Sequence, residues 1–180
     1  RGVGGSAITA RSCICQRSEF GFSRQTGETM SVTNRFVEAM NKNRRRLFHF
    51  TDSRNIPSIA GSGLLATAEL RQRGIDVVIG GDADSLGIDT HKGLDKFVRL
   101  SFCRTHPMSH VAKKRGSIET VRILTIKPDV LLRDGVRIAD QVATANEAII
   151  GDPDEMIPKR DLLATYQYLD WNVPENYDRR

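Results

Sequence analysis

The chain has 180 residues, of which 39% are apolar and 27% are charged, and this suits one globular domain with a single hydrophobic core. Its 27 Lys and Arg residues against 22 Asp and Glu residues give a formal net charge of +5, so the surface is moderately basic and can attract phosphate. The cysteines at positions 13, 15 and 103 are too few for a disulfide scaffold and lack the spacing of a zinc site. No run approaches the ~20 apolar residues of a membrane span, so we expect a cytoplasmic protein with no membrane segment.

Residues 1–29 differ in composition from the rest of the chain. They are rich in Gly, Ser, Thr and Arg and show no sustained hydrophobic period, so we expect a disordered or weakly structured segment. Met30 opens the first helical pattern, and one interpretation is that the native start lies there. The predicted organisation is therefore a disordered segment over 1–29 followed by one domain over 30–180.

The first helix is predicted over 31–46, where Phe36, Ala39 and Met40 follow a helical spacing. It ends in the run Arg44–Arg46, whose charges are favourable at a helix C-terminus. A contact with phosphate is the alternative explanation of this run.

A strand, a turn and a second helix follow. Leu47–Phe50 is predicted as the strand and carries His49, while the apolar positions between Ile56 and Leu64 predict the helix. Gly61 and Gly63 supply the end of that helix. Such a unit presents a polar side chain at the mouth of a pocket, and we expect the rest of the site to be organised around it.

The second half of the chain predicts mainly short strands. Over residues 66–94 the periodicity fails, apart from a helix-like piece at Glu69–Arg73, and a long loop is predicted. The aspartates of this loop lack the spacing of a calcium site, so no metal is expected. A short helix is predicted over Ser109–Arg115, and the whole pattern indicates an α+β fold. The predicted strands are Phe97–Phe102, Val121–Ile126, Val130–Leu132, Val136–Ile138, Ala148–Ile150 and Leu162–Tyr168.

The sequence patterns of the common nucleotide-binding and hydrolytic sites are absent. The chain has no G-x-x-x-x-G-K-S/T loop, no G-x-G-x-x-G, no G-x-S-x-G and no H-E-x-x-H. What remains is His49 on the first strand, Ser101 and Phe102 at the end of the second, and Glu147 before an apolar run. Taken singly, each has a structural explanation, because a lone strand histidine is commonly a hydrogen-bonded core residue and a lone glutamate is commonly solvated.

A resemblance brings these residues together. Their surrounding segments, in this order and spacing, resemble the DarT family of DNA ADP-ribosyltransferase toxins over Phe48–Tyr166. The segments are Leu47–Thr51 with Gly63–Leu65, Phe97–Phe102 with His106–Met108, Gly116–Ile118, and Val121–Leu132. The resemblance implies a compact ADP-ribosyltransferase-like fold with a central split antiparallel β-sheet and flanking helices. It also implies a glycosyltransferase that uses NAD as co-substrate, needs no metal, and joins ADP-ribose to a base in single-stranded DNA. The implied partner is a macrodomain antitoxin that removes the modification.

The resemblance also assigns site residues. It implies that Glu147 acts in transfer and that His49 contacts the nicotinamide riboside, with Asp140 and Glu155 as competing carboxylates. Cleavage of the bond to nicotinamide develops positive charge on the ribose, which a carboxylate stabilises, and the same carboxylate can take a proton from the attacking base. An aromatic ring, from Phe50 or Phe102, can stack on the nicotinamide. The residues implied for NAD binding are His49, Phe50, Thr51, Asn55, Lys92, Ser101, Phe102 and Met108.

The chain departs from the family pattern before the second strand. The best-known branch has there an arginine pair that engages the NAD phosphates, whereas this chain has His91–Lys96, and Lys92 lacks the bidentate fork of an arginine. The segments Leu100–Phe102 and His106–Met108 are closer to the branch that modifies guanine. Two alternatives stay open: an ADP-ribosyltransferase that acts on RNA or protein, and a non-catalytic module that binds nucleic acid through Arg44–Arg46 and exposed aromatic side chains.

Overall fold

The computed structural model describes residues 12–15, 30–81 and 83–159. Within these ranges the protein is a mixed α+β structure built on an antiparallel sheet with the strand order β4-β2-β3-β1-β5-β6. The strands are β1 (Ser12–Cys15), β2 (Leu47–Asp52), β3 (Val98–Ser101), β4 (Val121–Ile126), β5 (Arg137–Ala139) and β6 (Ile150–Gly151).

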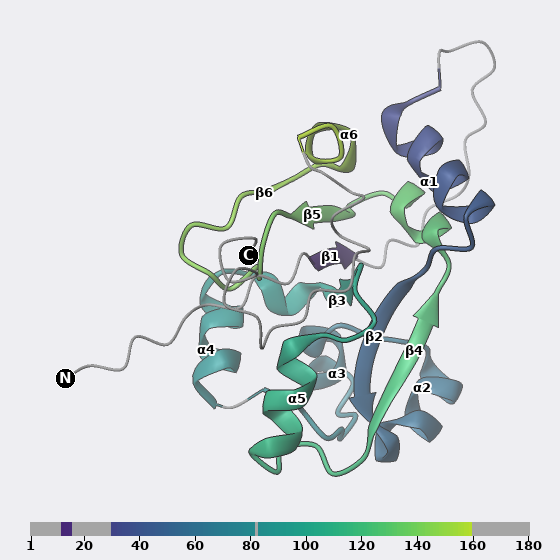
Figure 1. Ribbon diagram of the computed structural model, residues 1–180. Coiled ribbons are helices and arrows are strands. Elements are labelled where there is room, and N and C mark those ends of the chain that lie inside the picture. The colour runs from purple at the N-terminus through teal and green to yellow at the C-terminus, as the bar shows by residue number, and fades with distance from the viewer. Residues whose placement is uncertain (1–11, 16–29, 82, 160–180) are drawn as a thin grey trace, which may run out of the picture.

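Helices cover the sheet from two sides. In the view of Figure 1, α1 and α6 lie at the top, whereas α2 to α5 lie at the bottom. None of the helices in the described part of the chain is long and apolar enough to cross a membrane. The α-helices are α1 (Val32–Lys42), α2 (Ile56–Ser62), α3 (Thr67–Gln72), α4 (Ala83–His91), α5 (Pro107–Lys114) and α6 (Pro153–Met156), and the 3₁₀ turns are η1 (Ser53–Asn55), η2 (Leu94–Lys96) and η3 (Pro128–Leu132).

The main core forms where α1 packs against the sheet. Along β3 the side chains alternate between faces, so Leu100 and Phe102 enter this core together. Phe102 is 1% exposed, and its ring centroid lies 6.2 Å from that of Phe36 on α1. Burial of each such side chain contributes roughly 1.5–3 kcal/mol. The buried members of this core are Val37, Met40, Leu47, Leu100, Phe102, Leu131, Val136, Ile138, Met156 and Ile157.

Most of the predicted elements are confirmed. β4 has the predicted bounds and pairs with β2 along its whole length, from Leu47 opposite Ile126 to Asp52 opposite Val121. The helices α1 and α5 lie within the predicted ranges or within two residues of them, and α3 corresponds to the predicted helix-like piece. β5 and β6 begin one and two residues later than predicted.

Two predictions for the second half of the chain were wrong. Val130–Leu132 is not a strand but part of η3, because Pro128 starts a tight turn in which the N–H of Val130 reaches the carbonyl of Lys127. The stretch 66–94 is not a continuous loop, since it contains α4 as well as α3. The predicted strand Leu162–Tyr168 lies outside the described residues.

The segment predicted as disordered differs from that prediction at four residues. Ser12–Cys15 forms β1, and its backbone pairs with β3 on one side and with β5 on the other. A strand with partners on both edges needs no amphipathic pattern of its own, which explains why the composition of 1–29 did not reveal it. The rest of that segment lies outside the described residues.

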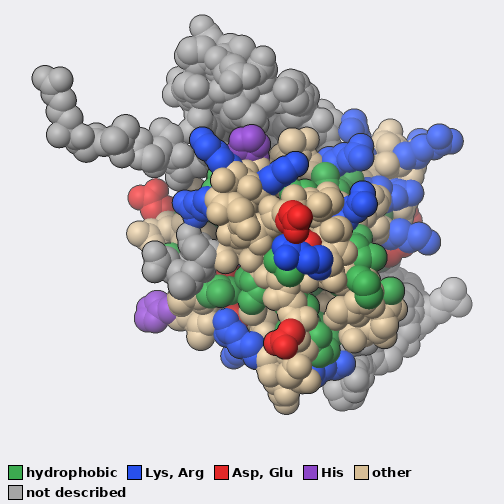
Figure 2. Space-filling view, turned by 90° about the horizontal axis from the view of Figure 1, so that it is seen from below, with side chains coloured by type: hydrophobic (Ala, Val, Ile, Leu, Met, Phe, Trp, Pro, Cys, Tyr) green, Lys and Arg blue, Asp and Glu red, His purple; other side chains and the backbone are tan. Residues whose placement is uncertain are grey.

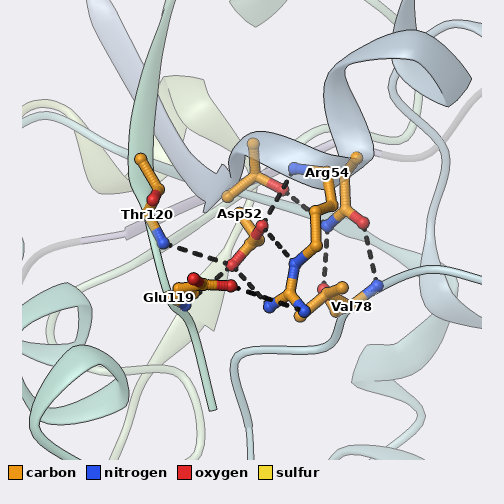
Figure 3. Close-up of polar contacts among 7 residues, drawn as sticks. Asp52, Arg54, Val78, Glu119 and Thr120 are labelled. Carbon is orange, nitrogen blue, oxygen red and sulfur yellow. Dashed lines mark hydrogen bonds and ion pairs between the residues drawn. The ribbon is translucent and has the colours of Figure 1, made fainter. Parts of the chain in front are cut away.

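A buried carboxylate ties the end of β2 to the start of β4. Asp52 is fully buried, and its Oδ1 accepts hydrogen bonds from the backbone N–H and the Nε of Arg54, both at 2.9 Å. Its Oδ2 accepts from Arg54 Nη2 at 2.9 Å and from the backbone N–H of Glu119 at 2.8 Å. Figure 3 shows this clamp, with Thr120 beside it. The hydrogen bonds from Arg54 hold the pKa of Asp52 well below its usual range, so the clamp carries a charged carboxylate at neutral pH.

We predict that Asp52→Ala destabilises the protein more than Arg54→Ala does. Asp52 is fully buried, and loss of its carboxylate leaves the N–H groups of Arg54 and Glu119 without their acceptor. The side chain of Arg54 is 53% exposed, and without it Asp52 still accepts hydrogen bonds from backbone N–H groups. Urea denaturation of both variants measures the difference as a shift in midpoint. An equal or smaller shift for Asp52→Ala would contradict the clamp.

Candidate functional site

The first group of candidate residues is centred on His49, at the point where β2 and β3 separate. Within the described residues, the pairing of these two strands is limited to Phe48 opposite Ser101. Beyond that pair, His49 Nδ1 lies 2.8 Å from the backbone carbonyl of Arg99, so the imidazole bridges the two strands. A carbonyl oxygen only accepts, so Nδ1 carries the proton. Burial lowers the pKa of His49, against a smaller opposing effect of this hydrogen bond, and the neutral ring keeps Nε2 as an acceptor.

Phe50 lies between two histidine rings. Its ring centroid is 6.5 Å from that of His49 and 5.6 Å from that of His106. Gly80 packs behind it: a Cβ at this position would lie 3.6 Å from the Phe50 ring and 2.8 Å from the side chain of Ile118. Glycine therefore lets the 77–81 segment approach the ring closely. Phe50 is half-buried, so part of its ring is accessible beside His49, and its stacking on nicotinamide stays a prediction.

Thr51 and Asn55 are paired within the protein. The amide of Asn55 donates to Thr51 Oγ1 at 2.9 Å and to the carbonyl of Val78 at 2.8 Å, and it accepts from the N–H of Val78 at 2.8 Å. Both side chains are buried. Their observed contacts hold the 77–81 segment beside β2, and a direct contact of either residue with NAD stays a prediction.

The structure contradicts the predicted stacking role of Phe102. Its ring is 1% exposed inside the main core, so it cannot face a ligand unless that core opens. Alternation along the strand explains the error, because residue 102 shares the core face with Leu100. Ser101, which points to the opposite face, is also buried, and its Oγ accepts a hydrogen bond from the N–H of Cys103 at 3.0 Å.

His106 and Met108 start α5 next to Phe50. His106 Nδ1 accepts the N–H of Met108 at 3.2 Å, which makes the histidine the N-cap of the helix. Burial lowers the pKa of His106 to about 4, so this ring too is neutral at neutral pH. Met108 is 36% exposed, and its contact with NAD stays a prediction.

The second group surrounds Glu147, on the loop that joins β5 to β6. Glu147 is exposed and follows Asn146 in a turn. A hydrogen bond from the N–H of Ala148 to the carbonyl of Ala145, at 3.3 Å, closes this turn. At the base of the loop, Asp140 Oδ1 accepts the N–H of Ile149 at 2.9 Å, so this competing carboxylate helps to close the loop. The other competitor, Glu155, lies in α6, which follows β6 in the chain.

The two groups stand on different parts of the sheet. His49 is on β2, and β3 and β1 lie between it and β5, which precedes the Glu147 loop. Three strand spacings separate β2 from β5, about 14 Å. The structure thus gathers His49, Phe50, His106 and Met108 on one side and places Glu147 on the other.

Lys92 belongs to the second group. Its ammonium donates to the carbonyls of Thr144 at 2.8 Å and Ala145 at 3.0 Å, in the loop that carries Glu147. Its predicted contact with NAD phosphate stays a prediction. The described residues contain no cluster of three His, Cys, Asp or Glu side chains arranged to hold a metal ion.

Sequence reasoning did not single out Arg99. Its carbonyl holds His49, and its guanidinium Nη2 lies 2.5 Å from Asp89 Oδ1 on α4. Its Nε is buried and has no hydrogen-bond partner among the described residues. The alternation on β3 signalled that Arg99 points away from the core, but only the structure shows that it reaches α4.

Comparison with known families decides to which family the chain belongs. A family model described as "ssDNA thymidine ADP-ribosyltransferase, DarT" matches residues 48–177, which include both His49 and Glu147. The chain belongs to the DarT family. Membership in the DarT family implies an ADP-ribosyltransferase that uses NAD as co-substrate and acts on single-stranded DNA, and it confirms the predicted resemblance. No curated protein and no solved structure matches the chain.

We predict that the stability of this DarT-family protein falls as the pH is lowered from about 7 to about 5, by about 1–2 kcal/mol from His106 alone. Above its ordinary pKa of 6.5 the histidine is neutral in both states, whereas below it the unfolded chain takes up a proton that the folded protein, with a pKa of about 4, does not. Urea denaturation across this range measures the slope. His106→Asn keeps a capping side chain and should reduce the slope, with a remainder from His49, whose pKa is also lowered. An unchanged slope would contradict a neutral His106.

Proposed function

We propose that this protein transfers ADP-ribose from NAD to a nucleobase in single-stranded DNA, as the toxin of a toxin–antitoxin or phage-defence system. The observation that carries the proposal is the DarT family match, which spans both candidate groups of the site. A cytoplasmic location and a macrodomain antitoxin that reverses the modification belong to the same proposal.

His49 and Phe50 suit the task of holding the nicotinamide half of NAD. The neutral imidazole is held by the backbone carbonyl of Arg99, and its Nε2 can accept a hydrogen bond from a ribose hydroxyl. The half-exposed Phe50 ring can stack on the nicotinamide. Because both side chains are held by protein contacts before the substrate arrives, little order is lost when it binds.

Glu147 suits the role of the transfer residue. As the bond between ribose C1′ and nicotinamide breaks, nicotinamide leaves with the bonding electrons and positive charge develops on the ribose, which a nearby carboxylate stabilises. The base then forms its bond to C1′ and gives up a proton, which Glu147 can accept. The exposed turn leaves this carboxylate open to both substrates.

The separation of β2 from β3 supports an ADP-ribosyltransferase-like fold with a split central sheet. The side chain of His49 takes over the link between the two strands after a single residue pair, so a gap opens in the ladder beside the candidate site. A substrate can reach strand residues in the middle of a sheet only where neighbouring strands part, because paired strands lie about 4.8 Å apart.

Two acceptors are candidates. The family description names thymidine, whereas the segments Leu100–Phe102 and His106–Met108 favour guanine. Purified protein should be incubated with NAD and with four single-stranded DNA oligonucleotides, each offering only one of the four bases as acceptor. Parallel reactions should offer RNA and protein as acceptors. We expect mass spectrometry to find an added ADP-ribose on a DNA oligonucleotide. Modification of RNA or protein alone would favour the related enzyme, and no product with any acceptor would refute the proposal.

We predict that Glu147→Gln lowers the rate of DNA modification by about 10²–10⁴-fold, the range for loss of a general base. The same change at the competing carboxylate, Glu155→Gln, and at the exposed Glu38 of α1 should leave the rate within a factor of about two, since neither lies on the loop of Glu147. The steady-state rate at which the modified oligonucleotide forms should be measured for all three variants. A large loss for Glu155→Gln instead would move the catalytic role to α6.

The basic side chains around α5 suit contact with the DNA backbone. Figure 2 shows Lys and Arg side chains spread over the face seen from below, with few acidic side chains among them. On α5, Lys113 and Lys114 are exposed in the last turn, and Arg122 is exposed on β4. The predicted run Arg44–Arg46 lies at the opposite end of β2, after α1, and Arg46 donates there to the backbone carbonyl of Arg45.

We predict that replacing Lys113 and Lys114 by Gln weakens binding of single-stranded DNA and lowers the slope of log affinity against log salt by about 1.4, which is about 0.7 for each lost phosphate contact. Fluorescence anisotropy with a labelled oligonucleotide at several salt concentrations measures both. A matched double variant at Lys42 and Arg44, on the far end of α1, is the control. If only the control pair changes the slope, the DNA path runs past α1.

A further inference from the structure

The helix α4 contacts both halves of the candidate site. Asp89 lies in its last turn, and Lys92 continues the helical pattern, since its N–H reaches the carbonyl of Ile88 at 2.9 Å. Residues three apart on a helix lie on the same side of it, so Asp89 and Lys92 can act together. Figure 1 shows α4 below the loop that joins β5 to β6.

Lys92 holds the turn that presents Glu147. The carbonyl of Ala145 accepts both the ammonium of Lys92, at 3.0 Å, and the N–H of Ala148, at 3.3 Å, and the latter bond closes the turn around Asn146 and Glu147. The carbonyl of Thr144 accepts the same ammonium at 2.8 Å. Hydrogen bonds from a charged donor are stronger than neutral ones, so Lys92 restrains the backbone two residues before the carboxylate.

The same loop is anchored at two further points. Ala143 is 2% exposed and belongs to a small core with Leu94, which follows Lys92 in η2. At the base of the loop, Asp140 Oδ1 accepts the N–H of Ile149. The Glu147 turn is therefore the tip of a loop whose stem is fixed, and Lys92 contacts the residues just before that tip.

On the other side, α4 supports His49. Asp89 Oδ1 lies 2.5 Å from Arg99 Nη2, and both side chains are less than one-third exposed. The backbone carbonyl of Arg99 in turn accepts a hydrogen bond from His49 Nδ1, at 2.8 Å. One helix thus contacts the residue that holds His49 and the loop that holds Glu147.

We propose that Lys92 is a positioning residue for Glu147, and that α4, through Lys92 and Asp89, sets the separation between Glu147 and His49. This inference rests on the proposed function for the roles of those two residues. It gives Lys92 a task different from the predicted contact with NAD phosphate, because two of its three N–H bonds point at the loop backbone. A positioning role acts on the turnover rate, whereas a phosphate contact acts on the binding of NAD.

Steady-state kinetics separate the two roles. For Lys92→Met we expect kcat for DNA modification to fall by about 10- to 100-fold, the effect of a misplaced catalytic group, while KM for NAD is unchanged. Lys92→Arg, which keeps a charged donor, should recover part of the loss. Lys96→Met removes an exposed lysine of η2 and is the matched control, with both constants unchanged. A rise in KM with kcat unchanged would assign Lys92 to the phosphate, and no change in either would also overturn the inference.

Hydrogen exchange tests the contact without relying on activity. In Lys92→Met the amide of Ala148 should exchange at least about tenfold faster than in the wild type, because the turn loses a charge-assisted restraint. The amides of β4, such as that of Leu124, should be unchanged and report that the fold is intact. If the wild type modifies no acceptor, the proposed function fails while the exchange result still decides on the contact. Equal exchange at Ala148 in both proteins would overturn the positioning role.

Discussion

The hydrogen bond between His49 and the carbonyl of Arg99 is the interaction on which the site depends. Two strands of a sheet normally satisfy each other's backbone groups, and where they part those groups need other partners. Here a side chain takes that place: the imidazole bonds the Arg99 carbonyl just beyond the pair of Phe48 and Ser101. The same bond fixes the ring's orientation and its tautomer, so the structural need of the sheet and the chemical state of His49 are met together.

Burial explains why several polar residues near His49 make hydrogen bonds within the protein. A buried polar group without a partner is costly, so Asn55 uses its amide on Thr51 and on both backbone groups of Val78, and Asp52 collects the N–H groups at the start of β4. These contacts hold β2, the 77–81 segment and β4 around Phe50. Among the groups left accessible to a substrate are the Phe50 face and Glu147.

The local pattern of the sequence was sufficient for the strands that carry the site. Alternation predicted β3 and β4, and the apolar run before Asp52 predicted β2, because each strand buries one face. The same pattern could have excluded Phe102, since it shares a face with Leu100. Sequence alone could not place α4, because its few apolar residues leave no periodic signal. Its contacts also depend on the tertiary fold: Asp89 reaches Arg99 on β3, and Lys92 reaches the loop at Thr144, 52 residues further along the chain.

The contacts of Lys92 show how a lysine can use its charge within the protein. An arginine offers a planar fork that grips a phosphate by two parallel bonds, whereas a lysine is a point charge with three donors in different directions. Backbone carbonyls of a turn suit such a point charge, and Lys92 meets two of them at Thr144 and Ala145. A lysine is therefore well suited to support the turn that carries Glu147. Since a transition state demands tighter placement than ground-state binding does, support of the Glu147 turn is the use of this charge that acts most directly on the rate.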